Sequence, residues 1–230
     1  MVRPEDELRD RFAVRTESFS HAGFAAEILL PRAADELIDV SEFNVDERLP
    51  YWAALWPSAR ALARWLLELE EPPAAPVLEL GCGVALPSLA LRHRAVDVLA
   101  TDYYEDALAF AAANAERNGL APLRTRLLDW RDPPPDLGRF ATIVAADVLY
   151  ERRNAEALRW LLPAVAAPSA RVLVADPGRL YAADFHSAMR ADGWAVAGIA
   201  AREEPSAEGV VSRVRLIELR AGTTSGTPAG

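Results

Sequence analysis

The 230-residue sequence contains no lysine, one cysteine and three histidines. A single cysteine, Cys82, excludes an internal disulfide, and the histidines at 21, 93 and 186 lack the spacing of metal ligands. No apolar run approaches the roughly 20 residues that a membrane span requires, and the N-terminal segment is charged. We therefore expect no disulfide, no metal and no membrane partner, and a cytoplasmic protein.

Acidic residues also outnumber basic ones. The sequence has 34 aspartates and glutamates and 25 arginines, which gives a formal net charge of −9. This balance argues against a nucleic-acid-binding surface and is better suited to a cationic partner. The use of arginine for every basic residue is typical of a coding bias. With 51% apolar residues, the chain is long enough for one large α/β domain with a buried core.

One short segment combines two glycines with two different apolar periods. Residues 76–80 form a short apolar run typical of a buried parallel strand, whereas Leu86 and Leu89 begin a helical repeat. Gly81 and Gly83 stand between them. Glycine allows positive φ and has no Cβ, so a ligand can lie directly against the main chain. The segment therefore indicates either a nucleotide-like ligand or only a tight turn.

The remaining chain alternates strand and helix patterns. A helix is expected from Pro57 to the prolines at 72 and 73, and the glycine turn leads into another. Further strands are expected at residues 95–102, 123–130, 140–150 and 171–178, and an antiparallel pair at 194–204 and 209–219. Such alternation predicts a mainly parallel sheet whose strand C-termini share one ligand-binding edge.

Three parts of the chain are distinguished by composition. Residues 1–48 are expected to form an N-terminal extension with a strand or hairpin that ends at Pro31. Residues 49–220 carry the alternating pattern and are expected to form the main domain. The Gly-, Ser- and Thr-rich residues 221–230 are expected to be a disordered tail.

An aspartate marks the end of the second, third and fourth predicted strands, namely Asp102, Asp129 and Asp147. Asp102 follows Gly83 by 19 residues, close to the distance of about 20 at which an acid reaches ribose hydroxyls in nucleotide-binding βαβ units. The alternative for Asp102 is a side chain that caps the following helix. Asp129 is suited to accept the amino hydrogens of an adenine.

The glycine pattern also discriminates between nucleotide ligands. A dinucleotide fingerprint requires a third glycine, but position 86 is leucine and Pro87 follows it. A nucleoside without phosphates, such as S-adenosylmethionine (SAM), suits this turn better. Trp130 offers an aromatic face for stacking, or fills the core. Glu79 lies in an apolar strand, where it is expected to fix the turn amides or to approach an amino group of the ligand.

Several motifs resemble one known family. The segments "ELGCG", "ATD", "LDW" and "ADVLYE", with "YWAALWPSARAL" ahead of them, resemble the seven-β-strand protein lysine methyltransferases, a family of class I SAM-dependent methyltransferases. The segments "PYWAALWP" and "ADPGR" resemble the subgroup that acts on the electron transfer flavoprotein β-subunit. The resemblance covers roughly residues 25–215.

This resemblance implies a fold and a set of site residues. The implied fold is a Rossmann-like, seven-stranded, mainly parallel sheet with helices on both faces and an antiparallel C-terminal strand pair. The implied cofactor is SAM, with contacts at Trp56, Gly81, Cys82, Gly83, Asp102, Trp130 and the backbone around Ala146. The family's Asp/Glu-x-x-Tyr/Phe element falls on Asp147 to Tyr150.

The same residues suggest how an acceptor would be held. Asp147 is expected to hold an amine by hydrogen bonding and Tyr150 to orient it, although Tyr150 could instead pack under the next helix. For the two tryptophans before the helix at Pro57, we predict a ligand role for Trp56 and packing for Trp52. No chemical role follows for the "DPGR" segment at 176–179 beyond shaping the rim.

The sequence therefore predicts a SAM-dependent N-methyltransferase acting on lysine side chains of a protein, with the electron transfer flavoprotein β-subunit as the first candidate substrate. One alternative is N-methylation of a small, nicotinamide-like amine, which an enclosed pocket around Asp147 would favour over an open rim. The other is a methyltransferase-like binding module without catalytic activity. Only turnover separates this module from an enzyme.

Overall fold

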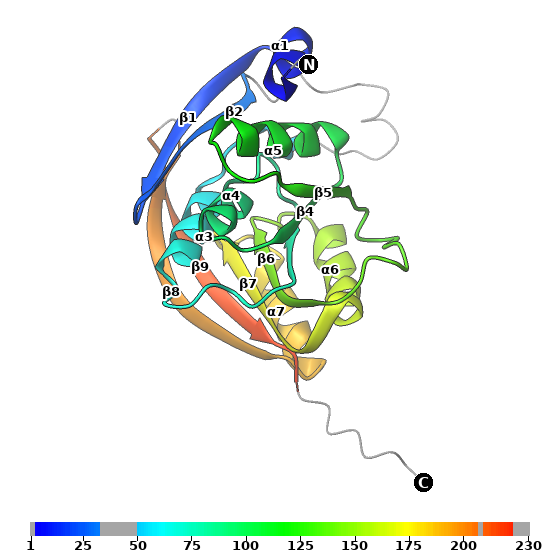
Figure 1. Cartoon of the computed structure of the whole chain (residues 1–230). Coiled ribbons are helices and arrows are strands. Elements are labelled where there is room, and N and C mark those ends of the chain that lie inside the picture. The colour runs from blue at the N-terminus through cyan, green and yellow to red at the C-terminus, as the bar shows by residue number, and fades with distance from the viewer. Residues whose placement is uncertain (1–2, 33–49, 207–208, 223–230) are drawn as a thin grey trace.

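The computed structural model describes residues 3–32, 50–206 and 209–222, and a seven-stranded sheet lies at its centre (Figure 1). Its strands are β3 (Val77–Leu80), β4 (Val98–Asp102), β5 (Arg124–Leu127), β6 (Phe140–Ala146), β7 (Ala166–Asp176), β8 (Ala195–Pro205) and β9 (Val211–Arg220). Their spatial order is β5-β4-β3-β6-β7-β9-β8. Strand β9 runs antiparallel to both β7 and β8, whereas the other neighbours are parallel. The predicted fold class is confirmed.

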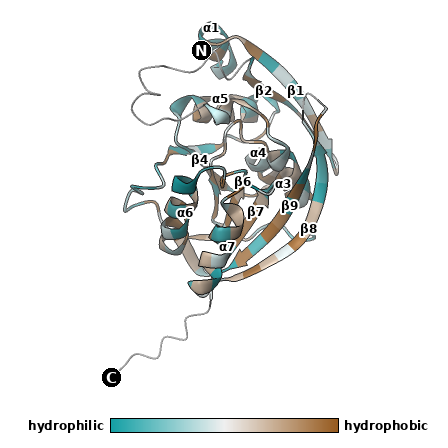
Figure 2. Ribbon diagram, turned by 180° about the vertical axis from the view of Figure 1, so that it is seen from behind, coloured by the Kyte–Doolittle hydropathy of each residue, from teal (hydrophilic) through white to brown (hydrophobic). Residues whose placement is uncertain are grey.

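Helices cover both faces of the sheet because its strands present apolar side chains in both directions. One hydrophobic cluster includes α3 (Pro57–Glu68), α4 (Leu86–His93) and α5 (Glu105–Arg117), and the other includes α6 (Arg152–Val165) and α7 (Ala182–Ala191). Along β3, Val77 belongs to the first cluster, and Leu78 and Leu80 belong to the second. Figure 2 shows hydrophobic residues along the central strands and hydrophilic ones on parts of α1 and α6.

The N-terminal segment adds a helix and a separate hairpin, α1 (Pro4–Arg11), β1 (Val14–His21) and β2 (Phe24–Pro31). Asn114 of α5, which is fully buried, fixes this hairpin to the main domain. Its Oδ1 accepts the Leu29 N–H at 2.7 Å, and its Nδ2 donates to the carbonyls of Leu29 and Val84 at 3.0 and 3.1 Å. Because Val84 follows the glycine turn directly, one side chain connects the hairpin to that turn.

Several elements differ from the sequence prediction. Helix α1 has no predicted counterpart, because ion pairs to α5, such as Glu5 with Arg117, hold it in place and local pattern does not reveal them. Helix α6 contains Pro163, which ordinarily marks a helix boundary. Helix α3 ends at Glu68, ahead of the prolines predicted to stop it. The strands predicted at 123–130 and 140–150 end early, so Asp129 and Asp147 follow their strands.

The predicted domain limits fall mainly on residues that the structure does not describe. The boundary between residues 48 and 49 lies outside the described ranges, as does most of the predicted tail at 221–230. The division into extension, main domain and tail therefore stays a prediction. Among the helices of the described ranges, none is long and apolar enough to cross a membrane.

Candidate functional site

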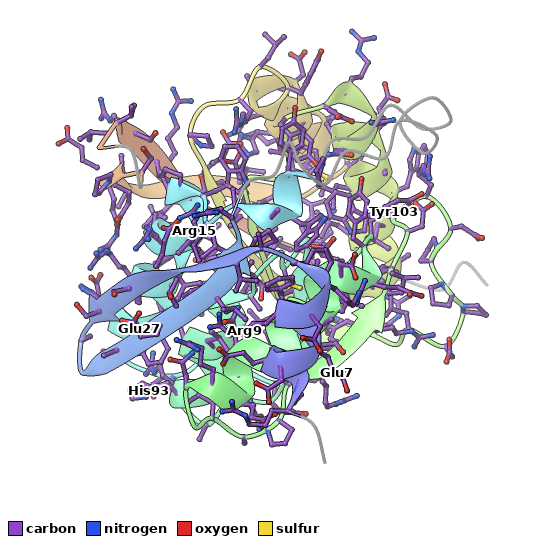
Figure 3. All side chains as sticks on the ribbon, turned by 90° about the horizontal axis from the view of Figure 1, so that it is seen from above. Glu7, Arg9, Arg15, Glu27, His93 and Tyr103 are labelled. Carbon is purple, nitrogen blue, oxygen red and sulfur yellow. The ribbon has the colours of Figure 1, made fainter. Side chains whose placement is uncertain are left out.

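A pocket lies at the carboxyl ends of β3, β4 and β6. The sheet grows from β3 to β4 and β5 on one side and continues with β6 on the other side, so the strand order reverses at this point. In Figure 3 the pocket residue Tyr103 lies across the molecule from Arg15 and Glu27 of the hairpin. The structure brings every residue predicted for the site to the wall of this pocket: Trp56, Glu79, Gly81, Cys82, Gly83, Asp102, Asp129, Trp130, Ala146, Asp147 and Tyr150. Their individual roles stay predictions.

The glycine turn between β3 and α4 has the backbone conformation that its glycines predict. Gly81 and Gly83 have φ of 68° and 51°, in the left-handed region that side chains disfavour. A Cβ on Gly83 would lie 3.1 Å from the Trp52 carbonyl oxygen, and one on Gly81 would lie 3.3 Å from the Trp130 ring. Glycine at both positions is therefore favoured by the positive φ and by the close packing around the turn. The tight-turn interpretation accounts for them without a ligand.

Cys82, between the two glycines, contributes mainly backbone. Its N–H donates to the Thr101 carbonyl at 2.9 Å, which fastens the turn to β4. Its side chain is buried, and burial raises the pKa of the thiol well above its ordinary value. The thiol therefore stays protonated and suits the pocket wall better than it suits nucleophilic chemistry.

Asp102, the last residue of β4, anchors both the glycine turn and the entrance to α5. Its side chain is buried, and Oδ2 accepts the Gly83 N–H at 2.8 Å while Oδ1 accepts the Tyr104 N–H at 3.1 Å. Each carboxylate oxygen carries further lone pairs, so these bonds are compatible with additional donors from a ribose. The bond from Tyr104 comes from the residue that precedes the first turn of α5, and the N-cap of this helix has no side-chain capping hydrogen bond. The ribose role of Asp102 stays a prediction.

Glu79 lies on β3 with a side chain that is 1% exposed. Burial, and to a smaller extent the nearby Asp102, raises its pKa to about 8, so the carboxyl is protonated at neutral pH. It accepts a hydrogen bond from the Ser88 hydroxyl of α4. Within the turn, the N–H groups of Cys82 and Gly83 donate to Thr101 and Asp102 and not to Glu79. The expected role of Glu79 at the turn or at an amino group of the ligand stays a prediction. No motif in the sequence indicated Ser88 as a partner of Glu79.

Asp129, the second of the three strand-end acids, has a different environment. Asp129 accepts hydrogen bonds from Nε and Nη2 of Arg131 at 2.9 and 2.7 Å, and the Asp129 side chain is 30% exposed. Trp130 next to it is half-buried, borders the pocket and packs against the cluster that contains α6. Both interpretations of Trp130, as ligand platform and as core residue, are therefore compatible with its position.

Asp147 lies just after β6 with φ of 57° and is 7% exposed. Its Oδ1 accepts a hydrogen bond from Nε of Arg179 at 2.6 Å, and its Oδ2 accepts one from Nη2 of the same guanidinium at 3.1 Å. The Ser58 hydroxyl at the start of α3 lies 3.5 Å from Oδ2. Burial raises the pKa of the Asp147 carboxyl above its usual range, although the ion pair with Arg179 opposes this shift.

Arg179 is the residue that sequence reasoning missed. It ends the "DPGR" segment, to which we assigned only a shaping role. The structure corrects this, because Asp176 Oδ1 accepts the N–H groups of Gly178 and Arg179 at 2.7 and 2.9 Å and so directs Arg179 toward Asp147. The Arg179 guanidinium also lies 5.6 Å from the centre of the Trp56 ring.

Aromatic side chains form the pocket wall next to Asp147. Tyr51 contacts Tyr150 edge-on at 5.0 Å between ring centres and Trp56 at 6.0 Å, and the Trp56 indole N–H donates to the Tyr51 carbonyl at 2.7 Å. Tyr51 belongs to a short 3₁₀ helix, η2 (Tyr51–Ala53). Trp52 of the same helix is buried against Phe110 at 5.6 Å, as expected of a packing residue, and also borders the pocket.

Comparison with solved structures defines the class to which this fold belongs. Magnesium protoporphyrin IX methyltransferase from Synechocystis, solved with bound SAM, aligns with a TM-score of 0.57 at 19% identity and covers 80% of this chain and 86% of its own. The ribosomal protein L11 methylase of Lactobacillus delbrueckii aligns with a TM-score of 0.50 at 20% identity, over 70% and 76%. The fold is that of SAM-dependent methyltransferases.

Sequence comparison then identifies the family. A model of the lysine methyltransferase family matches residues 45–188, and the chain belongs to this family. Electron transfer flavoprotein beta subunit lysine methyltransferases are similar to it, that of Rattus norvegicus at 35% identity over 136 residues and that of Danio rerio at 35% over 133. The match covers 56% of this chain and 51% of each relative, so the chain spans about half the length of these curated relatives. The predicted family and cofactor, SAM, are confirmed.

Proposed function

We propose that this chain transfers a methyl group from SAM to the side-chain amine of a protein lysine. The observation that carries this proposal is one pocket that joins the glycine turn and Asp102 at one end to Asp147 and Tyr150 at the other. Membership of the lysine methyltransferase family supports it. The relatives named above make the electron transfer flavoprotein β-subunit the first candidate acceptor.

The residues of the turn fit a nucleoside that lacks phosphates. Leu86 is fully buried at the start of α4, so this turn lacks the third glycine that a pyrophosphate-binding turn uses. We assign the ribose hydroxyls to Asp102, and the adenine to Asp129 and Trp130. Glu79 is protonated at neutral pH and so offers both a donor and an acceptor. When bound, SAM supplies an activated methyl group on a positively charged sulfur.

The acceptor end of the pocket has to receive an uncharged amine. A free lysine has a pKa near 10.4, so its ammonium form dominates at neutral pH and must lose a proton before it can act as a nucleophile. Burial disfavours the charged form. Asp147 accepts a hydrogen bond from the amine, Tyr150 orients it, and Trp56 closes the wall toward the methyl group. Most of the rate enhancement then comes from alignment and exclusion of water.

A transfer assay tests the proposal directly. Purified protein, labelled SAM and purified electron transfer flavoprotein β-subunit are incubated, and the labelled residue is identified by mass spectrometry. Because this chain contains no lysine, methylation of its own lysines cannot contribute to the signal. We expect label on lysines of the acceptor, and Asp147→Asn serves as the matched inactive control.

The other outcomes identify the alternatives. Label that enters only small molecules of a cell lysate would favour the small-molecule N-methyltransferase. Binding of SAM without transfer to any acceptor would favour the binding module. Calorimetry that detects NAD binding without SAM binding would overturn the assignment. The predicted cytoplasmic location and the expected lack of a nucleic-acid partner stay predictions.

A further inference from the structure

The ion pair between Asp147 and Arg179 lies at the acceptor end of the pocket, where the proposed function requires the amine of the acceptor to be uncharged. Asp147 borders the pocket, whereas Arg179 reaches it from the loop between β7 and α7 and contacts the pocket through Asp147 and Trp56. The side chains are 5% and 35% exposed, so the carboxylate is shielded and the guanidinium is partly solvated. Both carboxylate oxygens accept from the same guanidinium, which is the geometry that arginine provides and lysine does not.

The other groups around this pair carry charges of both signs. Glu151 and Arg153 also line the pocket, and the Arg215 guanidinium of β9 lies beside Gly178, 3.7 Å from where a Cβ on that glycine would be. Ser58 of α3 faces Asp147 with a neutral hydroxyl, and Tyr51 of η2 lies near the guanidinium. Asp176 at the end of β7 is the second acid that faces the pair. It is 1% exposed, and its Oδ2 has no partner among the described residues. Arg179 is the cation that contacts the Asp147 carboxylate directly, and Asp176 is a further acid near the pair.

We propose that Arg179 is a positioning residue that keeps Asp147 neutralised, so that the pocket receives the acceptor as a neutral amine and not as an ammonium ion. This inference rests on the proposed function. An unpaired carboxylate within about 4–6 Å would stabilise the ammonium and hold its proton. With Arg179 in place, that stabilisation is weakened and the proton passes to water before transfer, while Asp147 keeps a lone pair for the amine N–H.

The opposite arrangement makes a different prediction. If Asp147 instead captured the ammonium ion and Arg179 only blocked the site, removal of Arg179 would increase transfer at neutral pH. The two arrangements are separated by the pH dependence of kcat. A purely structural role for Arg179 would lower activity at every pH and would not displace the profile.

The test compares kcat against pH for the parent, Arg179→Gln, Arg179→Lys and Arg64→Gln, with the β-subunit acceptor. Arg64 is the matched control because it pairs with buried Glu204 at 2.9 Å and lies 5.2 Å from the Phe19 ring, away from the pocket. We expect Arg179→Gln to shift the profile upward by about one pH unit, so that kcat at neutral pH falls about tenfold and recovers at high pH. SAM affinity should stay within about twofold.

The remaining variants sharpen the expectation. Arg179→Lys should keep the parent profile with a kcat a few-fold lower, since it retains the charge but loses the bidentate fork. Arg64→Gln should keep the parent profile. If Arg179→Gln does not fold, the double variant Asp147→Asn with Arg179→Gln removes both charges. In this double variant no carboxylate is left at position 147 to hold the ammonium, so its binding of butylamine at pH 7 should not exceed that of the parent. Tighter binding of butylamine by the double variant than by the parent would contradict the proposal. A parent-like profile in a folded Arg179→Gln, or faster transfer at neutral pH, would overturn the proposal.

A binding measurement keeps this test independent of turnover. Butylamine, which reproduces the lysine side chain, is titrated against each variant at pH 7. S-adenosylhomocysteine, which lacks the methyl group of SAM, is present so that no transfer takes place. We expect Arg179→Gln to bind the charged amine at least about tenfold more tightly than the parent and Arg64→Gln do. Equal binding would contradict the role of Arg179 even if the parent methylates lysine. Tighter binding by Arg179→Gln in a protein that transfers nothing would reject only the proposed reaction.

Discussion

Asp102 and Asp147 are the same residue type at the same edge of one sheet, with similar exposed fractions of 6% and 7%. Their partners differ. Asp102 accepts backbone N–H groups of Gly83 and Tyr104, 19 and 2 residues away in sequence, within the βαβ unit that contains the turn. Asp147 pairs with Arg179, 32 residues away, and approaches Ser58, 89 residues away. One end of the pocket is therefore a local backbone structure, and the other is assembled from distant side chains.

The largest effect is expected from Asp102→Ala. The loss of charge-assisted bonds to a ribose should weaken SAM binding by about 2–4 kcal/mol, or roughly 30- to 1,000-fold. Calorimetry measures this, and a thermal melt shows whether the loosened turn still allows folding, as we expect. Asp102→Asn retains one oxygen and should bind with intermediate affinity. Parent-like SAM binding by Asp102→Ala would remove Asp102 from the ribose site.

Asp147→Ala should separate binding from chemistry. Its partners lie at the acceptor end, so SAM affinity should stay within a few-fold while transfer falls a hundredfold or more, about 2.7 kcal/mol of transition-state stabilisation. Asp147→Asn keeps the volume but leaves the Arg179 guanidinium without its carboxylate partner beside the amine, so it should also be defective. Single-turnover kinetics with the β-subunit acceptor provide the measurement. Normal turnover by both variants would mean that Asp147 has no part in the reaction.

Glu79→Gln probes the buried acid between these two ends. The folded pKa of about 8 exceeds the ordinary value of 4.5, so the folded protein holds a proton that the unfolded chain releases between these pH values. Stability of the parent should therefore fall by about 1.4 kcal/mol per pH unit as pH rises through this window. Urea unfolding at pH 5.5 and 7.5 should show a smaller loss for Glu79→Gln. An identical pH dependence in both proteins would show that Glu79 ionises normally.

The smallest effect is expected from Asp129→Asn. Asp129 is partly exposed and paired with Arg131, and such surface ion pairs contribute about 0.2–1 kcal/mol. SAM affinity should fall by about two- to fivefold, measured by the same calorimetry as for Asp102→Ala. A loss of SAM affinity above about tenfold would show that Asp129 holds the adenine in a desolvated position. Asp129 would then contribute to SAM binding in the way proposed for Asp102.

Local pattern was sufficient for the cofactor end of the pocket. The short apolar run, the glycines and the following helical repeat predict β3, the turn and α4, because each depends on residues close in sequence. The contact between Glu79 and Ser88 was not predicted, since both residues are polar positions on elements whose relative angle the sequence does not specify. Helix α6 was missed because Pro163 interrupts its pattern.

The sequence by itself determined that strands alternate with helices along most of the main domain, and hence that strand-end acids meet at one edge, because parallel strands linked by crossovers place their carboxyl ends together. Only the tertiary structure decided what each acid contacts. The loop after β7 carries Arg179 to Asp147, and the start of α3 brings Ser58 to the same carboxylate. Side-chain pairing across such distances depends on how helices pack on the sheet, and that packing is a property of the whole core.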